Sequence, residues 1–309
     1  MKVLIWLILA IIWGSTWIFI KIGLADLPPI TFASARFILA LLLLYPAMKI
    51  LKIPFPKGRD QWKVMATTGI LQFSINYSSV FWSELYISSG LAAVLQATIP
   101  VFGLPLAWYF LPQEKMTPLK IIAVLLGVAG VSVIFFDQLA INDMMAFAGS
   151  AAIVIGAYAA AQSSVLVKAR ASGIHPVGIL FAQMLCGLPP IVIYAFAAEG
   201  NPLNHNWSLR AVLCLLFLTL VGTIAAFWLY YWLLSKIEST RAMMISLVTP
   251  LLAVILGAVV LNEKLPPLTL AGGVLILASI AMIVFRKKDR ADIPELEAAA
   301  EGTTGSTAS

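Results

Sequence analysis

Four polar side chains recur on one face of an otherwise apolar stretch, at Gln72, Asn76, Ser79 and Ser83. Intervals of four, three and four residues place them along one side of a helix. An amide or hydroxyl in hydrocarbon is unfavourable unless it is hydrogen-bonded. This face therefore meets either a wet cavity, where it can hydrogen-bond a small polar solute, or neighbouring helices, where it joins one helix to another.

Four more polar residues, in other apolar stretches, are also expected to hydrogen-bond a solute. Tyr158 and Gln162 are one helical turn apart, on a different face from a run of small residues that recur every four positions and predict close packing against another helix. The small residues are Ala148, Ala152, Gly156, Ala160 and Ser164. Together with Gln72 and Asn76, the residues that we expect to hydrogen-bond a solute are Gln96, Tyr158, Gln162 and Ser246.

Two tryptophans supply an aromatic surface in the first apolar stretch. Trp13 and Trp17 are four residues apart and share a face with Trp6. They lie too deep in the stretch for the aromatic belt at a membrane interface. Their wide, rigid faces suit a cavity that accepts aromatic or amphipathic solutes. Packing in the protein core is the alternative for each of them.

Pro100 and Pro250 occupy matching positions in two similar stretches, SGLAAVLQATIPVFGLPLAWYFLPQEKMTP and STRAMMISLVTPLLAVILGAVVLNEKLPP. A proline inside a helix cannot donate to the carbonyl four residues earlier, so the carbonyls of Gln96 and Ser246 are left free. We expect a symmetric pair of bends that line or gate a solute path. A structural kink whose free groups bond to neighbouring helices is the alternative.

Arg36 is the one basic residue well inside an apolar stretch. Ionisable groups at such positions are typical of a functional site or of a buried partner. We expect a structural or gating role for Arg36, with its guanidinium bonded to carbonyls at a helix end. Its counterpart in the second half of the chain is Gln183, so the charge at this level is asymmetric.

The sequence lacks the groups that an enzyme or a metal site needs. His175 and His205 fall in loops, and the chain has no metal-ligand spacing, nucleophile motif or phosphate-binding loop. We therefore expect no catalytic activity, no metal and no cofactor. No Asp or Glu lies in the middle of an apolar stretch, which favours facilitated or weakly coupled movement of a solute over proton-driven movement.

The elements that must position these residues are membrane-spanning helices. Apolar residues make up 61% of the 309-residue chain and charged residues 11%, and the mean hydropathy is +0.98. Apolar runs of about 20 residues, the length that crosses a bilayer, recur almost to the end of the chain without the strict alternation of barrel strands. The sequence predicts an all-α membrane protein with ten spans, at residues 3–24, 29–50, 62–84, 88–111, 117–136, 144–167, 175–198, 209–235, 240–262 and 267–285.

Basic residues concentrate at alternate ends of these spans, which predicts that both termini are cytoplasmic. That orientation explains the net charge of +6 without a nucleic-acid partner. Ten spans divide into two copies of five, and an odd number makes the second copy enter the bilayer from the opposite side. We expect inverted five-helix repeats at residues 1–137 and 143–287, followed by a disordered cytoplasmic tail at 288–309.

Several short motifs follow one another in a set order: Trp13-Gly14-Ser15-Thr16, Phe32-Ala33-Ser34-Ala35-Arg36-Phe37, and the blocks Pro100 to Glu114 and Pro250 to Glu263. With them the chain resembles the EamA family of the drug/metabolite transporter superfamily, from the N-terminus to about Arg286. The resemblance implies a ten-helix carrier, commonly a bacterial inner-membrane exporter of amino acids or other small metabolites. Its central cavity is walled mainly by helices 1, 3, 4, 6, 8 and 9. Related small multidrug carriers use an acidic residue in the first helix, where this chain has Gly14, Ser15 and Thr16.

We expect a carrier in the bacterial inner (plasma) membrane that moves small metabolites, such as amino acids or amphipathic compounds, outward by alternating access around a midplane cavity. Its partners are then a small-molecule solute and the lipid bilayer, and the protein is a monomer or a homodimer. A flippase for lipid-linked substrates, with a side opening to the bilayer, is the main alternative. An integral membrane enzyme is a further one.

Overall fold

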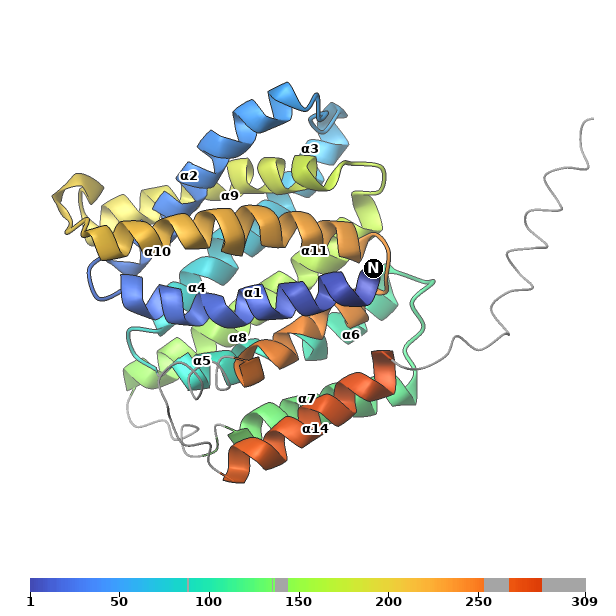
Figure 1. Ribbon diagram of the computed structural model, residues 1–309. Coiled ribbons are helices and arrows are strands. Elements are labelled where there is room, and N and C mark those ends of the chain that lie inside the picture. Colours follow the sequence, from blue (N-terminus) through green and yellow to red (C-terminus); the bar gives the residue numbers. More distant parts are fainter. Residues whose placement is uncertain (88, 135, 137–143, 253–266, 285–309) are drawn as a thin grey trace, which may run out of the picture.

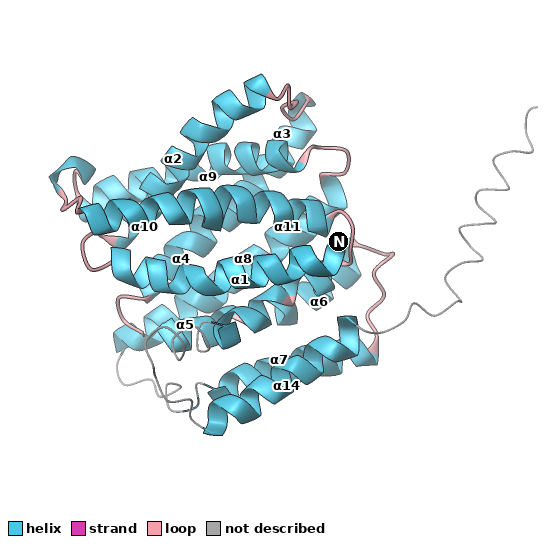
Figure 2. Ribbon diagram, viewed as in Figure 1, coloured by secondary structure: helices cyan, strands magenta, loops and turns pink. Residues whose placement is uncertain are grey.

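The computed structural model describes residues 1–87, 89–134, 136, 144–252 and 267–284, which form helices joined by short loops (Figures 1 and 2). No strand occurs in these residues, so the expected all-α fold is confirmed for them. Three expectations fall outside the described residues: the position of Glu263, the boundary at 137–143 between the expected halves, and the tail at 288–309.

The first part of the chain contains α1 (Lys2–Gly23), α2 (Pro29–Ile50), α3 (Gly58–Gly69), the π-helix η1 (Ile70–Asn76), α4 (Tyr77–Ser83), α5 (Ser89–Gln96), α6 (Ile99–Phe110) and α7 (Pro118–Ile134). The second part contains α8 (Met144–Arg170), α9 (Pro176–Glu199), the short 3₁₀ helix η3 (Pro202–Asn204), α10 (Leu209–Thr219), the π-helix η4 (Leu220–Ala225), α11 (Ala226–Leu234), α12 (Ser239–Met243) and α14 (Pro267–Val284). Residues 245–252 are also helical.

Within the described residues, five helical runs are long and apolar enough to cross a membrane: Lys2–Gly23, Pro29–Ile50, Met144–Arg170, Pro176–Glu199 and Leu209–Leu234. Each corresponds to an expected span within a few residues. Shorter apolar helices coincide with three further expected spans, at Val94–Phe110, Pro118–Val133 and Ala271–Met282. The expected span at 62–84 is the continuous run of α3, η1 and α4, and the one at 240–262 leaves the described residues after Leu252.

The π-helical segment η1 lies where two backbones approach each other closely. A Cβ added at Gly69 would lie 2.2 Å from the carbonyl oxygen of Gln183 in α9, and one at Gly187 would lie 2.4 Å from the carbonyl oxygen of Gly69. Only glycine fits such an approach. Ser74 Oγ donates a 2.5 Å hydrogen bond to the Gly187 carbonyl, which holds η1 against α9. The wider π turns change the direction of the side chains that follow.

The long helices α1, α2 and α9 and the run of α10, η4 and α11 pack against one another, whereas α8 packs against shorter helices. In Figure 1, α1 runs beside the continuous α10, η4 and α11, α2 lies against α9, and α7 and α14 form a separate pair at the lower edge, in agreement with the helix contacts. The central helix α8 contacts α3, η1, α4, α5 and α6. The glycine Gly130 of α7 lies against α14, where an added Cβ would be 2.7 Å from the Gly272 carbonyl oxygen.

Polar contacts join the two parts of the chain at one end of the bundle. Glu199, at the end of α9, accepts hydrogen bonds from the backbone N–H groups of Ile30 (2.8 Å) and Thr31 (2.6 Å) and so caps the first turn of α2. In the loop after α1, Asp26 pairs with Arg210 at 2.7 Å. Hydrogen bonding from Arg210, and then from Ser208, lowers the pKa of Asp26 from its ordinary value of 3.8.

Candidate functional site

A cavity of about 130 Å³ lies between α1, α2, η1 with α4, α5, α8, α11 and residues 242–249. It draws its walls from both parts of the chain. Of the expected site residues, the cavity brings together Trp13, Trp17, Arg36, Gln72, Asn76, Gln96 and Ser246. Arg36 is the only charged side chain among the described lining residues.

The polar wall of the cavity is built around Asn76 and Gln96. Gln96 Nε2 donates a 3.0 Å hydrogen bond to Asn76 Oδ1, which joins the end of α5 to the end of η1. Gln96 Oε1 is buried and has no hydrogen-bond partner. A buried amide oxygen without a partner is unfavourable, so a donor brought by a bound solute would stabilise this atom.

The expected polar stripe divides between the two roles considered for it. Gln72 and Asn76 line the cavity. Ser83 Oγ instead donates a 2.7 Å hydrogen bond to the Gly149 carbonyl in α8. Ser79 lies against Gly156 of α8, where an added Cβ would be 3.0 Å from the serine Cβ. Ser79 and Ser83 therefore join helices, whereas Gln72 and Asn76 face the cavity.

The aromatic wall is formed by Trp13 with two residues of α11. The Trp13 ring lies 5.5 Å from the ring of Phe227 and 5.2 Å from that of Tyr230, between ring centroids. Tyr230 is fixed by its hydroxyl, which donates a 2.9 Å hydrogen bond to Ser164 Oγ of α8. Trp17 also lines the cavity and packs against a small apolar cluster that includes Leu91. The indole Nε1 of Trp13 is buried without a hydrogen-bond partner.

Tyr158 and Gln162 are not among the described residues that line the cavity, and their role as solute-binding residues stays a prediction. Tyr158 is 42% exposed, and its ring packs against Phe102 of α6 at 5.8 Å between centroids. Ala160 and Ser164, on the face of α8 expected to pack against a helix, also line the cavity. The expected close packing occurs on the same face at Gly156, which lies against Ser79, because small residues allow both a helix and an open cavity to come close to α8.

The two prolines differ in their surroundings, and neither is among the described lining residues. Pro100 lies in the first turn of α6, directly after a non-helical break at Ala97 and Thr98. Pro250 lies within the helical run 245–252, and the break on that side is at Met244. The expected symmetric bends are therefore not at matching positions. The Ser246 carbonyl, which Pro250 leaves free, accepts a 3.2 Å hydrogen bond from Thr249 Oγ1.

Arg36 reaches from α2 to the π-helical segment η4. Its Nε donates to Thr223 Oγ1, and its Nη2 donates to the Gly222 carbonyl at 3.0 Å. Arg36 therefore bonds to a backbone carbonyl, but this carbonyl belongs to a π-helix in the middle of a span rather than to a helix end, and the structural or gating role stays a prediction. The expected counterpart Gln183 is fully buried away from the cavity, and neither polar atom of its side-chain amide has a hydrogen-bond partner.

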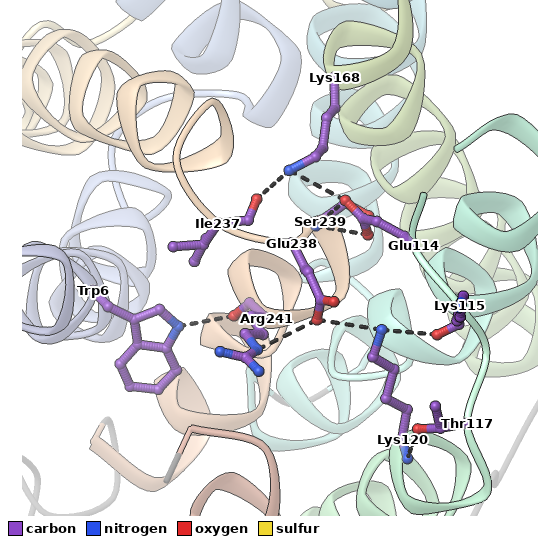
Figure 3. Close-up of polar contacts among 10 residues, drawn as sticks. All are labelled: Trp6, Glu114, Lys115, Thr117, Lys120, Lys168, Ile237, Glu238, Ser239 and Arg241. Atoms are coloured by element: carbon purple, nitrogen blue, oxygen red, sulfur yellow. Dashed lines mark hydrogen bonds and ion pairs between the residues drawn. The ribbon is translucent and has the colours of Figure 1, made fainter. Parts of the chain in front are cut away.

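One helical turn beyond the cavity, charged residues from both parts of the chain meet in a network that the sequence did not predict (Figure 3). We call it the end network and define it as Glu114, Lys120, Lys168, Glu238 and Ser239. The Glu114 carboxylate accepts hydrogen bonds from Ser239 N at 2.8 Å and from Ser239 Oγ at 2.6 Å, and so caps α12. It also pairs with Lys168 Nζ at 3.1 Å.

The end network continues to the first turn of α7, where Lys120 lies. Lys120 Nζ lies 3.2 Å from Glu238 Oε2, and Arg241 Nε lies 3.3 Å from the same oxygen. Nearby, Trp6 Nε1 donates a 3.0 Å hydrogen bond to the Arg241 carbonyl (Figure 3). The side-chain contacts of Glu114 and Trp6 cross from the first part of the chain to the second, and so does the pair of Lys120 with Glu238. Lys120 Nζ also donates a 2.9 Å hydrogen bond to the Lys115 carbonyl within the first part. The helix that Glu114 caps is distant in sequence, because Ser239 lies 125 residues further along the chain.

Comparison with known proteins identifies the family. The model of the EamA-like transporter family matches residues 1–136 and, separately, 147–285. The chain is 25% identical over 276 residues to the "uncharacterized transporter YoaV" of Bacillus subtilis, covering 89% of this chain and 94% of that protein. It is 30% identical over 276 residues to the "uncharacterized inner membrane transporter YedA" of Escherichia coli, covering 88% and 87% of the two chains.

Two further proteins extend the similarity. An "uncharacterized transporter" of Archaeoglobus fulgidus is 30% identical over 285 residues, covering 91% of this chain and 99% of that one. A protein of known crystal structure superimposes with a TM-score of 0.75 over 91% of this chain and 95% of that chain, at 17% identity, which shows a common fold. With its apolar helices, the chain is therefore a multi-pass membrane protein that belongs to the EamA-like transporter family.

Proposed function

We propose that this protein is a carrier that exports small metabolites by alternating access, with the solute held in the cavity between two inverted five-helix halves. The observation that carries the proposal is the cavity itself, which is lined from both parts of the chain by Trp13, Asn76, Gln96 and Ser246. Two separate family matches, at residues 1–136 and 147–285, support the division into halves.

The end network supports the alternating part of the proposal. Every ion pair or hydrogen bond that Glu114 makes within it goes to Lys168 or Ser239, on the other side of the division. Such a set of contacts closes one end of the space between the halves. The basic residues at this end include Lys115, Lys120 and Lys168, which favours a cytoplasmic position for it. Breaking these contacts opens the cavity to that side.

A flux assay tests the transport function. The full chain is reconstituted into liposomes, and the uptake of a panel of labelled neutral, anionic and cationic metabolites and of a labelled phospholipid is compared with that of empty liposomes. Saturable uptake of a soluble compound supports the carrier. Movement of the phospholipid alone supports the flippase, chemical conversion of a compound supports an enzyme, and no saturable flux of any compound contradicts the carrier.

A topology experiment tests the inverted halves independently. Reporters active only in the cytoplasm are fused after residue 137, at the end of the first half, and after residue 287, at the end of the second. Inverted halves of five spans place these two positions on opposite faces of the membrane, with position 287 in the cytoplasm. Equal activity of the two fusions would contradict inverted halves and with them the proposed architecture.

A further inference from the structure

Arg36 is a buried cation in the cavity wall. The residue is 1% exposed and lines the cavity from α2. Its guanidinium carbon lies 5.0 Å from the ring centroid of Tyr77 and 5.7 Å from that of Phe37. The aromatic faces stabilise the cation in part, but they do not neutralise its charge.

Two of the three guanidinium nitrogens have structural partners, and the third does not. Nε and Nη2 bond to Thr223 and Gly222 and hold the π-helical segment η4. Nη1 is buried and has no partner at hydrogen-bond geometry, although the Tyr77 hydroxyl is near enough to the guanidinium to stabilise its charge. A purely structural role accounts for the first two nitrogens and leaves Nη1 unexplained, since an unpaired buried donor on a charged group is strongly unfavourable.

Arg36 also lacks the counter-ion that other buried or partly buried cations in the described residues possess. Lys168 pairs with Glu114, and Lys120, itself 8% exposed, pairs with Glu238. None of the ion pairs found in the described residues involves Arg36. Charged groups inside a membrane protein pair with one another or mark the path of a substrate.

The rest of the cavity indicates what kind of molecule would bring the missing negative charge. Trp13, Phe227 and Tyr230 form an aromatic wall, which suits an apolar or aromatic body. A guanidinium presents a planar set of donors that matches a carboxylate. Because the described lining holds no carboxylate of its own, an anionic solute meets no repulsion there.

We propose that the cavity binds a solute with one carboxylate on an apolar or aromatic body, and that Arg36 Nη1 donates a hydrogen bond to this carboxylate. The proposal rests on the transport function proposed above and adds to it the charge class of the solute. Arg36 thus has two roles, since it fixes η4 through Nε and Nη2 and selects the solute through Nη1.

A binding experiment on the purified full chain in lipid nanodiscs tests the proposal. The probes are phenylacetate, 3-phenylpropionate and 4-phenylbutyrate, each compared with its own neutral amide, which has the same body and nearly the same shape. Calorimetric titrations, corrected by titrations into empty nanodiscs, give the dissociation constants. At least one acid is expected to bind about tenfold or more tightly than its amide, the ratio for one charge-assisted hydrogen bond.

Two substitutions at Arg36 and one matched control test whether Arg36 causes the preference for acids over amides. Arg36→Gln should bring the acid-to-amide ratio close to one, and Arg36→Lys, which keeps the charge without the planar donors, should give an intermediate ratio. Arg59→Gln, at an exposed residue in the first turn of α3, should keep the ratio of the unmodified protein. Gel filtration and circular dichroism show whether each variant is folded.

The acid-to-amide binding ratio of the unmodified protein tests the proposal even if Arg36→Gln does not fold. Equal binding of every acid and its amide, binding of none of the acids, or an unchanged ratio in folded Arg36→Gln would each overturn the proposal. These results are distinct from a failure of the transport function. Saturable flux of neutral or cationic compounds in the liposome assay, without preference for acids, would keep the carrier and reject the carboxylate.

Discussion

The side-chain amide of Gln96 donates a hydrogen bond of 3.0 Å to Oδ1 of Asn76 at the cavity wall. The two residues come from different helices, because Gln96 ends α5 and Asn76 ends the π-helical segment η1. The bond therefore fixes the width of the cavity on its polar side. It also orients Gln96 Oε1, which has no protein partner.

We predict that Gln96→Ala and Asn76→Ala each reduce flux in liposomes about fivefold or more, as expected for the loss of about 1 kcal/mol of hydrogen bonding to a solute. Membrane insertion should remain normal. Gln162→Ala serves as the matched control, because Gln162 lies in a spanning helix outside the described lining. Unchanged flux in both cavity variants would remove Gln96 and Asn76 from the site.

We predict that Trp17→Ala lowers the flux of aromatic solutes more than that of small polar solutes, because the cavity loses an aromatic surface. Flux of the two classes is measured in parallel in the same preparation. Tyr158→Ala, which removes an exposed ring that packs on Phe102, should leave the ratio between the classes unchanged. Equal losses for both classes in Trp17→Ala would show that Trp17 only packs the core.

We predict that Glu114→Gln opens the cavity at the end network. The neutral amide weakens the pairing with Lys168 and the cap on Ser239, and removing one partner from a buried ion pair costs about 3–5 kcal/mol. A Ser246→Cys probe is introduced after Cys186 and Cys214 are replaced by alanine. Its rate of labelling by a membrane-impermeant thiol reagent applied at that end should increase in Glu114→Gln.

The same labelling experiment has a control in Asp60→Asn, since the exposed pair of Asp60 and Lys63 lies in α3. Exposed ion pairs contribute little, so the labelling rate should not change in this variant. A labelling rate in Glu114→Gln equal to that of the unmodified background would mean that the network does not close the cavity.

We predict a stabilising contribution from Asp26 that disappears in acid. Because bonding to Arg210 lowers the pKa of Asp26 in the folded protein, the contribution is fully present above the ordinary value of 3.8 and is lost as the pH falls through the lowered value. The thermal unfolding of Asp26→Asn should occur below that of the unmodified protein at pH 7, and the difference should shrink below about pH 4. A difference that stays constant down to pH 2 would contradict this linkage.

The sequence was sufficient for the helices because their apolar runs are long. Spans such as 29–50 and 209–235 differ by only a residue or so from helices of the structure. The residues that line the cavity from α1 and η1 were also predictable, since Trp13, Trp17, Gln72 and Asn76 are large or polar where lipid would favour small apolar side chains.

The failures have local physical causes. A constant period of 3.6 residues misses the π-helical segments η1 and η4, and with them the position of Thr223 opposite Arg36. Ser164 lines the cavity and Tyr158 is not among the described lining residues, which the sequence did not indicate because polarity alone does not fix the rotation of a helix rich in alanine. The end network depends on contacts across more than 100 residues of sequence, such as that of Glu114 with Ser239, which no local pattern contains.

The charge of Arg36, which no carboxylate neutralises, determines how transport responds to voltage. Arg36 belongs to α2 and stays with the protein, so the charge that crosses the bilayer is that of the solute. A monoanion leaving a cell whose interior is 100 mV negative gains about 2.3 kcal/mol, enough for roughly fifty-fold accumulation outside. The resting voltage alone would then drive efflux, without a proton or sodium ion. In liposomes, a potassium diffusion potential set with valinomycin should accelerate or reverse acid flux according to its sign, and flux indifferent to voltage would contradict this consequence.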